Sequence, residues 1–102
     1  MKVLEYKLVK RSKILKYIFP KWVKAFTFNN IIFIKDDNIS ENLLSHELIH
    51  VKQYKENGIL KFLVLYFYHY FKNLIILKNS KLAYLMIPFE IEAYMNETKG
   101  DN

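Results

Sequence analysis

The sequence predicts a small α+β domain, mostly helical, in which a β-hairpin lies beside a long amphipathic helix. Three observations predict it: two β-prone runs flank an Asn-Asn pair within residues 25–34, a capped amphipathic helix fits residues 40–57, and a strongly apolar run fills residues 59–78. The length suits a single domain, residues 1–102. Because 52% of the residues are hydrophobic and only two are glycine, a dense core and short loops are expected.

Residues 3–19 predict an amphipathic helix, with a strand over part of the segment as the alternative. Apolar side chains recur there at near-helical spacing with lysines between them, namely Leu4, Leu8, Leu15 and Ile18. Pro20 is the expected end of this helix, because proline lacks the backbone N–H that a helix interior needs.

Residues 1–24 form a basic N-terminal segment. They carry eight basic side chains against Glu5 alone, whereas the rest of the chain carries eight basic and nine acidic side chains. The expected role of such a segment is a solvated helix face, with contact to an anionic membrane surface or an acidic partner as the alternative, and nucleic acid is not an expected partner. Its charges interrupt every apolar run before it reaches the length of a signal peptide. The expected location is therefore cytoplasmic, with membrane association left open.

Residues 25–34 predict a β-hairpin. The runs Ala25–Phe28 and Ile31–Ile34 are β-prone, and Asn29 and Asn30 between them tolerate the positive φ that a tight turn needs. We expect Ile31–Ile34 to be an edge strand that borders a cleft, where an extended peptide can add to the sheet by main-chain hydrogen bonding.

A capped helix is predicted from about residue 40 to Asn57. Asn38 or Ser40 can cap its first turn, and Gly58 is its expected stop. Apolar and polar side chains occupy opposite arcs of its helical wheel, so one side of the helix is expected to pack on the core.

The apolar residues 59–78 predict a second helix, which ends at the break formed by Asn79 and Ser80. Its length suits a membrane span, but a lysine costs about 2.5–3.5 kcal/mol at the centre of a membrane helix. The polar interruptions are Lys61, His69, Lys72 and Asn73. We therefore expect a helix buried in the core of the domain, with surface association or a true span as the alternatives. A last helix is expected from Pro88 to before Gly100.

The pattern His46-Glu47-Leu48-Ile49-His50 lies within the helix predicted from about residue 40 to Asn57, and it predicts a zinc site. Histidines four residues apart share one face of a helix, where a single Zn²⁺ can take a nitrogen from each at about 2.0–2.1 Å. Glu47 is turned about 100° from His46, beside the metal, where it can take a proton from a metal-bound water. The alternative is a coincidental pair of surface histidines. The chain has no cysteine, so every further ligand must be His, Asp or Glu.

A second motif follows at residues 88–94, which read Pro-Phe-Glu-Ile-Glu-Ala-Tyr, after the run His-Glu-Leu-Ile-His-Val-Lys-Gln at 46–53. With these two motifs the chain resembles the gluzincin-type HExxH metallopeptidases, and among them small bacterial proteins that combine His-Glu-Leu-x-His-Val-x-Gln with Pro-Phe-Glu-x-Glu-Ala. The resemblance implies a minimal zincin-like fold, peptide-bond hydrolysis and Glu90 as the third zinc ligand. It places Tyr94 where Asp or Asn often supports the site.

Glu90 is also favoured as third ligand by its position, although two alternatives stay open. It lies near the start of a predicted helix, where the helix dipole stabilises a negative charge, and Tyr94 shares its face four residues on. Glu92 points elsewhere on the same helix, and His69 lies within the apolar run. Either could serve as the third ligand if Glu90 does not.

The predicted function is zinc-dependent hydrolysis of peptide bonds in a peptide or protein substrate, with Glu47 as general base. Tyr94 or Tyr54 is expected to stabilise the oxyanion. One alternative is a zincin-like scaffold that binds metal without turnover. The other is a protein associated with a membrane surface or nucleic acid through the basic N-terminal segment. The sequence gives no oligomeric state.

Overall fold

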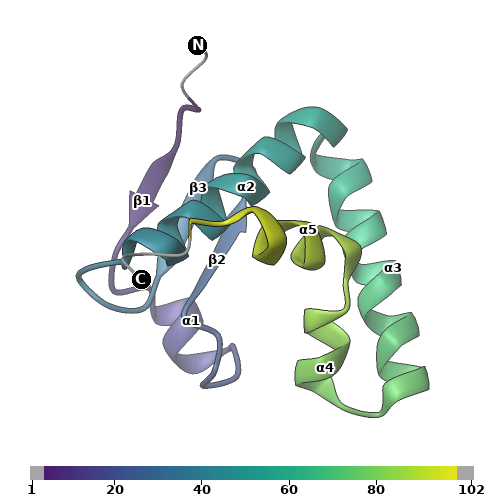
Figure 1. Ribbon diagram of the computed structural model, residues 1–102. Coiled ribbons are helices and arrows are strands. Elements are labelled where there is room, and N and C mark those ends of the chain that lie inside the picture. The colour runs from purple at the N-terminus through teal and green to yellow at the C-terminus, as the bar shows by residue number, and fades with distance from the viewer. Residues whose placement is uncertain (1–3, 99–102) are drawn as a thin grey trace.

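The computed structural model describes residues 4–98, and within them it contains a three-stranded sheet and five helices (Figure 1). The predicted α+β class is confirmed. In chain order the elements are β1 Lys7–Val9, α1 Lys13–Tyr17, β2 Ala25–Phe28, β3 Ile31–Ile34, α2 Glu41–Asn57, α3 Ile59–Leu77, α4 Ser80–Leu85 and α5 Pro88–Asn96.

The sheet has the strand order β1-β3-β2. Strands β2 and β3 form the predicted antiparallel hairpin, and Asn29 in its turn has a φ of 55°. Strand β1 pairs in parallel with the other side of β3, with Leu8 opposite Ile32. The prediction that Ile31–Ile34 is an edge strand is therefore wrong: β3 is central, and β2 is the edge strand beside α2.

The predicted single helix over residues 3–19 is also wrong, and the strand alternative is confirmed for Lys7–Val9. Arg11 has a φ of 51°, which separates β1 from the short helix α1. The Ser12 hydroxyl then caps α1 by accepting a hydrogen bond from the Leu15 amide. The segment extends because pairing with β3 satisfies its backbone and lets Leu8 pack on the core of the sheet.

Helix α2 begins and ends where the local signals place it. The Ser40 hydroxyl accepts a hydrogen bond from the Leu43 amide, and Gly58 ends the helix with a φ of 85°. Helix α2 packs against β2, α3 and α5, so it lies at the centre of the fold (Figure 1). The core between α2 and the sheet is built from buried apolar side chains: Ala25, Ile32, Ile34 and Val51.

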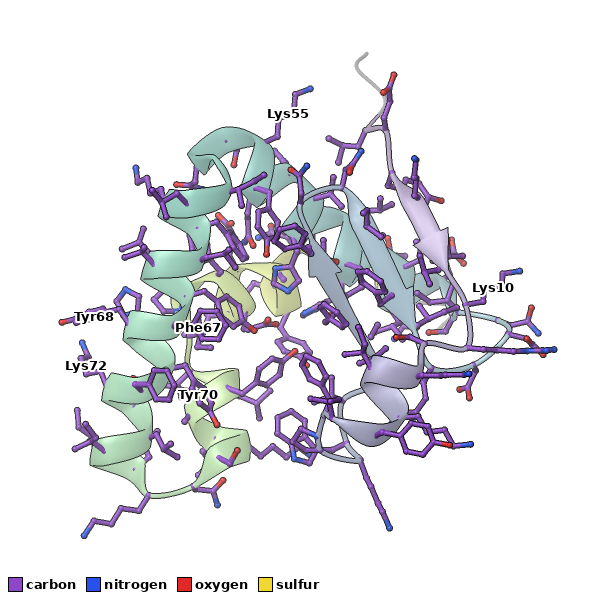
Figure 2. All side chains as sticks on the ribbon, turned by 180° about the vertical axis from the view of Figure 1, so that it is seen from behind. Lys10, Lys55, Phe67, Tyr68, Tyr70 and Lys72 are labelled. Atoms are coloured by element: carbon purple, nitrogen blue, oxygen red, sulfur yellow. The ribbon has the colours of Figure 1, made fainter. Side chains whose placement is uncertain are left out.

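Helix α3 spans Ile59–Leu77 as predicted, but the prediction that it is buried is wrong. Phe62 is its one buried residue, and only 6% of its most apolar window is buried. By length and composition it is apolar enough to cross a membrane. Its exposure follows from the fold, because α3 and α4 form an arm beside the sheet and only one side of α3 meets other elements (Figure 1). Tyr68 and Lys72 point away from the body of the protein in Figure 2.

Two short helices complete the chain. Helix α4 lies within a region left without a helix prediction, and the Asn79 side chain caps it by accepting a hydrogen bond from the Leu82 amide. Helix α5 begins at Pro88, as predicted, and ends at Asn96. It packs on α2, and this contact brings the two sequence motifs together.

Candidate metal centre

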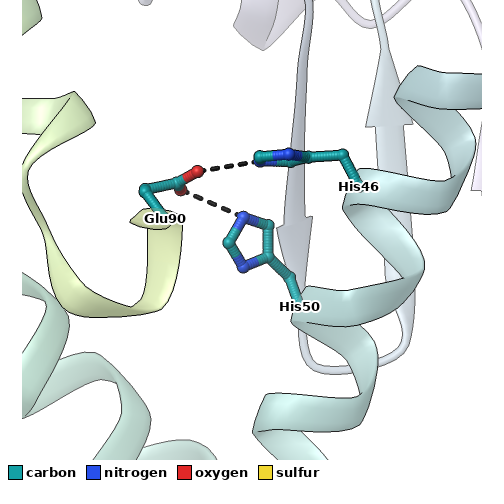
Figure 3. A group of neighbouring side chains, drawn as sticks. All are labelled: His46, His50 and Glu90. Atoms are coloured by element: carbon teal, nitrogen blue, oxygen red, sulfur yellow. Dashed lines mark hydrogen bonds and ion pairs between the residues drawn. The ribbon is translucent and has the colours of Figure 1, made fainter. Parts of the chain in front are cut away.

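Helices α2 and α5 bring two imidazoles and one carboxylate together (Figure 3). His46 Nε2 lies 2.8 Å from Glu90 Oε1, and His50 Nε2 lies 3.0 Å from Glu90 Oε2. All three residues are buried, with 2–4% of their surface exposed. Their ligand atoms lie within 4.8 Å of one another, so the group can hold a metal ion.

The His50 ring supplies a direct test of this group as a metal site. Its Nε2 atom is fully buried and makes no hydrogen bond, although the Glu90 carboxylate is close enough for an ion pair. A fully buried ring nitrogen that faces a carboxylate without a well-formed hydrogen bond calls for an explanation such as an ion held between the two groups. Ligand atoms that share one ion at about 2.0–2.1 Å lie roughly 3–4 Å apart. Here the two imidazole nitrogens lie 2.8 and 3.0 Å from Glu90, and all three ligand atoms lie within 4.8 Å of one another, so small side-chain shifts reach that spacing. The residues therefore fit a metal ion.

Hydrogen bonds to the far nitrogen of each ring orient both histidines. His46 Nδ1 donates to Glu97 Oε1 at 2.8 Å, and His50 Nδ1 donates to Gln53 Oε1 at 2.8 Å. A proton held on Nδ1 leaves the Nε2 lone pair available for a metal. Both Nε2 atoms face Glu90, so the rings are already turned toward a common point.

Gln53 and Tyr66 hold this arrangement in place from two further directions. The Gln53 amide donates from Nε2 to the Phe89 carbonyl at 3.0 Å and to Glu92 Oε1 at 2.6 Å, which fixes its Oε1 toward His50. The Tyr66 hydroxyl donates to Glu90 Oε2 at 2.6 Å. The three ligand side chains are thus oriented by contacts from α2, α3 and α5.

The two alternative third ligands lie outside the group. The carboxylate of Glu92 accepts the hydrogen bond from Gln53, and His69 lies half-buried on α3 with its ring edge-on to Tyr68. Among the residues the structure describes, the metal-binding group consists of His46, His50 and Glu90.

The group is a cluster of mutually stabilised charges. Burial by itself lowers the pKa of His50, but the Glu90 carboxylate outweighs burial and the net pKa is raised to about 9. The pKa of His46 is raised as well, with Glu90 again outweighing burial. Burial raises the pKa of Glu90, yet His50 and His46 hold it well below its ordinary range. His50 therefore favours a proton at neutral pH, and a metal must displace this proton.

Glu47 lies beside the metal-binding group and is not part of it. It is buried, and its Oε1 accepts a hydrogen bond from the Thr27 hydroxyl of β2 at 2.8 Å. Burial raises the pKa of Glu47, although His50 counteracts part of this effect. Glu47, His50 and Glu90 together line a pocket of about 270 Å³. Most of its wall is aromatic or aliphatic and includes Phe19, Phe26, Phe28, Leu63 and Phe67.

The two tyrosines expected to stabilise an oxyanion have different surroundings. The Tyr94 ring packs on His46 with 4.3 Å between ring centroids, and it borders a second pocket with Glu47. The Tyr54 hydroxyl donates to the Thr27 carbonyl at 3.1 Å, so its proton is already engaged in a hydrogen bond to the backbone. Of the two, Tyr94 is the one placed at a pocket that His46 and Glu47 share.

Four residues of the site were missed at the level of sequence. Gln53 lies three residues after His50 on the same helix, so the helical spacing alone could have identified it. Thr27, Tyr66 and Glu97 come from β2, α3 and the end of α5, and only the folded chain brings them close. No local pattern marks these three.

No protein-family model matches this chain, and no curated protein or solved structure matches it. The resemblance of its two motifs to gluzincin-type metallopeptidases therefore stays a prediction. The geometry alone supports a more general class: this is an α+β protein with a buried His-His-Glu group that can hold a metal ion.

Proposed function

We propose that this protein is a zinc-dependent peptidase in which His46, His50 and Glu90 hold zinc and Glu47 is the general base. The observation that carries the proposal is the buried convergence of two Nε2 atoms and one carboxylate beside Glu47. Two imidazoles and a carboxylate suit zinc among the common metals. Three protein ligands also match the pattern of catalytic zinc sites, which keep one position open.

The chemistry divides between the metal and the chain. Zinc bound by these ligands supplies Lewis-acid chemistry, which polarises a carbonyl and makes water more acidic. Glu47 takes a proton from a water in the pocket and gives it to the leaving amine, and its raised pKa makes it a stronger base than an ordinary carboxylate. The hydrogen bond from Thr27 keeps the carboxyl oriented toward the pocket.

The substrate is proposed to be a peptide in extended form that lies along β2. Strand β2 is an edge of the sheet and contributes Thr27 and Phe28 to the pocket wall. Main-chain hydrogen bonding to an edge strand is a common mode of peptide recognition. Tyr94, at the second pocket beside His46, is the proposed donor to the oxyanion.

Zinc content and cleavage, measured together, test this proposal. Protein stripped of metal and reloaded at neutral pH is expected to hold about one zinc per chain and to cut members of a proteome-derived peptide library. Glu47→Gln removes the base but no ligand, so zinc content is expected to stay normal while hydrolysis falls by about two to four orders of magnitude. Glu90→Ala is the contrasting variant and is expected to lose both zinc and activity.

Three results would contradict the proposal in different ways. Failure of the unaltered protein to take up zinc removes the metal centre. Zinc uptake that survives Glu90→Ala but not His69→Ala means that the ligand set is wrong. Cleavage that Glu47→Gln leaves unchanged means that another residue is the base or that the activity belongs to a contaminant.

A second function, a metal-binding scaffold without turnover, is favoured by one observation. All three proposed ligands are nearly inaccessible to solvent, with 2–4% of their surface exposed, as is common where a metal serves to hold a fold together. Stoichiometric zinc with no cleavage of any library peptide would select this function over the peptidase.

A further inference from the structure

Helix α3 turns a continuous apolar surface away from the rest of the protein. We define its outer face as five exposed side chains: Leu60, Val64, Tyr68, Phe71 and Ile75. On a helix with 3.6 residues per turn these five lie within an arc of about 80°. Leu60 is 77% exposed and Ile75 is 75% exposed, so both ends of the face are open. An apolar stripe of this length on a solvent-exposed surface marks an interaction site.

The opposite side of α3 fixes this face outward. Phe62 stacks on Tyr54 and Phe89, with ring centroids 3.8 and 4.5 Å away. The Tyr66 hydroxyl donates to Glu90, and Asn73 donates to a carbonyl of α4 at 3.1 Å. If α3 spanned a membrane, these side chains would be separated from their partners on α2, α4 and α5. The helix is therefore held with one side in the protein and the other side free to meet a surface.

The charge around the outer face has one sign. Residues 57–89 contain four lysines and no aspartate or glutamate. Lys61 and Lys72 follow the outer face on the helical wheel, and Lys78 lies at the end of α3. Lys81 lies in α4 and borders the second pocket with His46 and Glu47, away from the outer face. Within residues 4–98 none of these four lysines pairs with a carboxylate.

These charges discriminate between the possible occupants of the outer face. A second copy of the same face would bring three more lysines without any acidic group, and like charges repel. An anionic bilayer offers both an apolar interior and phosphate groups for the lysines. Tyr68, whose ring lies 5.8 Å below the Lys72 ammonium group, is of the amphipathic type favoured at the boundary between lipid and water.

We propose that the outer face of α3 lies flat on an anionic lipid surface. Leu60, Val64, Phe71 and Ile75 enter the boundary between headgroups and acyl chains, and the lysines extend to the lipid phosphates. The basic N-terminal segment is not this contact, since Lys10 and Lys72 lie at opposite ends of the molecule (Figure 2). The proposal is independent of the metal centre.

Co-sedimentation with vesicles tests the proposal. The vesicles are phosphatidylcholine with or without roughly a third of phosphatidylglycerol, at low salt, and binding to the anionic vesicles is expected. Leu60→Ser combined with Ile75→Ser is expected to weaken it about tenfold or more, because an apolar side chain of this size changes a transfer equilibrium by that factor. The fold of this variant is expected to be unchanged because both side chains are largely exposed, and circular dichroism checks this.

A matched pair of charge variants separates the face from overall charge. Replacing Lys61, Lys72 and Lys78 by Gln is expected to weaken binding about a hundredfold or more. The control replaces three lysines of the N-terminal segment by Gln, namely Lys10, Lys13 and Lys16. The net charge of both variants changes by the same amount, and the two are compared at 0.1 M salt, where screening over about 10 Å limits the expected loss of the control to a few-fold.

Four outcomes would overturn the proposal. The unaltered protein fails to bind anionic vesicles at low salt, or the N-terminal control weakens binding as much as the α3 variant does. A third such outcome is a dimer in sedimentation equilibrium that Leu60→Ser with Ile75→Ser abolishes, because a second copy would then be the occupant of the outer face. Alkaline carbonate fails to release the bound protein, which means that α3 inserts as a span.

Discussion

At the scale of single residues, each histidine of the metal-binding group depends on the partner of its far nitrogen. Gln53 Oε1 accepts from His50 Nδ1 and thereby keeps the Nε2 lone pair directed at Glu90. Glu97 has the same relation to His46. The spacing of the histidines in the sequence shows that they share a face, but it does not show which way their rings turn.

Gln53→Ala is expected to weaken zinc binding about 10- to 100-fold, because His50 loses the acceptor that fixes its ring. Competition against a chelating dye measures the change. Glu92→Ala is the matched control, since it removes another partner of Gln53 and leaves the acceptor of His50 in place. Equal zinc affinities of the Gln53→Ala and the unaltered protein would contradict the assigned role.

The part of the site that follows from local geometry is the part that one helix encodes, whereas Glu90 was indicated by the second motif and its place near a helix start. His46, Glu47 and His50 share the surface of α2, and their relative placement follows from helical geometry alone. Glu90 lies on a different helix, 40 residues after His50, and its place in the group depends on how α5 packs on α2. Tyr66 and Glu97 escape a single-sequence reading for the same reason.

At the scale of elements, local signals predicted where the hairpin and α2 begin and end, whereas tertiary contacts decided strand pairing and helix burial. The Asn pair of the hairpin and the caps of α2 act over a few residues, and the structure bears them out. A strand at residues 7–9 was only the alternative to a helix, because its pairing with β3 joins residues 24 positions apart, as Lys7 and Ile31 are. The exposure of α3 was missed because a continuous apolar run suits both a core helix and a helix that faces lipid.

The connection between α2 and α3 yields a prediction at this scale. Gly58 has a φ of 85° and a ψ of 156°, a conformation that only glycine adopts readily. A Cβ added there meets no atom within 4 Å, so backbone strain is the whole cost of a substitution. Gly58→Ala is expected to reduce the free energy of unfolding by about 1–3 kcal/mol in denaturant titration.

Glu56→Ala, two residues earlier on an exposed position of α2, is the control for Gly58→Ala. A change of less than about 0.5 kcal/mol is expected for it, because surface substitutions in a helix seldom do more. If Gly58→Ala is equally harmless, the backbone at this junction has an alternative that side chains tolerate.

At the scale of the whole molecule, the candidate metal centre joins side chains of helices that pack on one another. His46 and His50 come from α2 and Glu90 comes from α5. Tyr66 of α3 donates to the same carboxylate. A metal ion in this group would therefore stabilise the packing of three helices at once, including the arm that carries the outer face of α3.

Removal of zinc is accordingly expected to lower the stability of the entire fold. Zinc that binds the folded chain alone, at a free concentration 100 times its dissociation constant, adds about 2.7 kcal/mol to the free energy of unfolding. A chelator should abolish this increment in a thermal or denaturant titration. Glu90→Ala should be insensitive to chelator, because it lacks a ligand from the start.

The size of the zinc increment is expected to grow with pH, and the sign follows from His50. Its pKa in the metal-free fold is raised to about 9, above its ordinary value of 6.5. The stabilising charge on His50 is therefore complete below about pH 6.5 and is lost as the pH rises toward 9, which weakens the metal-free protein. Zinc competes with the same proton, so its apparent affinity rises over the same interval. The loaded and metal-free proteins should therefore differ more in unfolding free energy at about pH 8 than at about pH 6, and a difference that shrinks with pH would exclude His50 as a ligand.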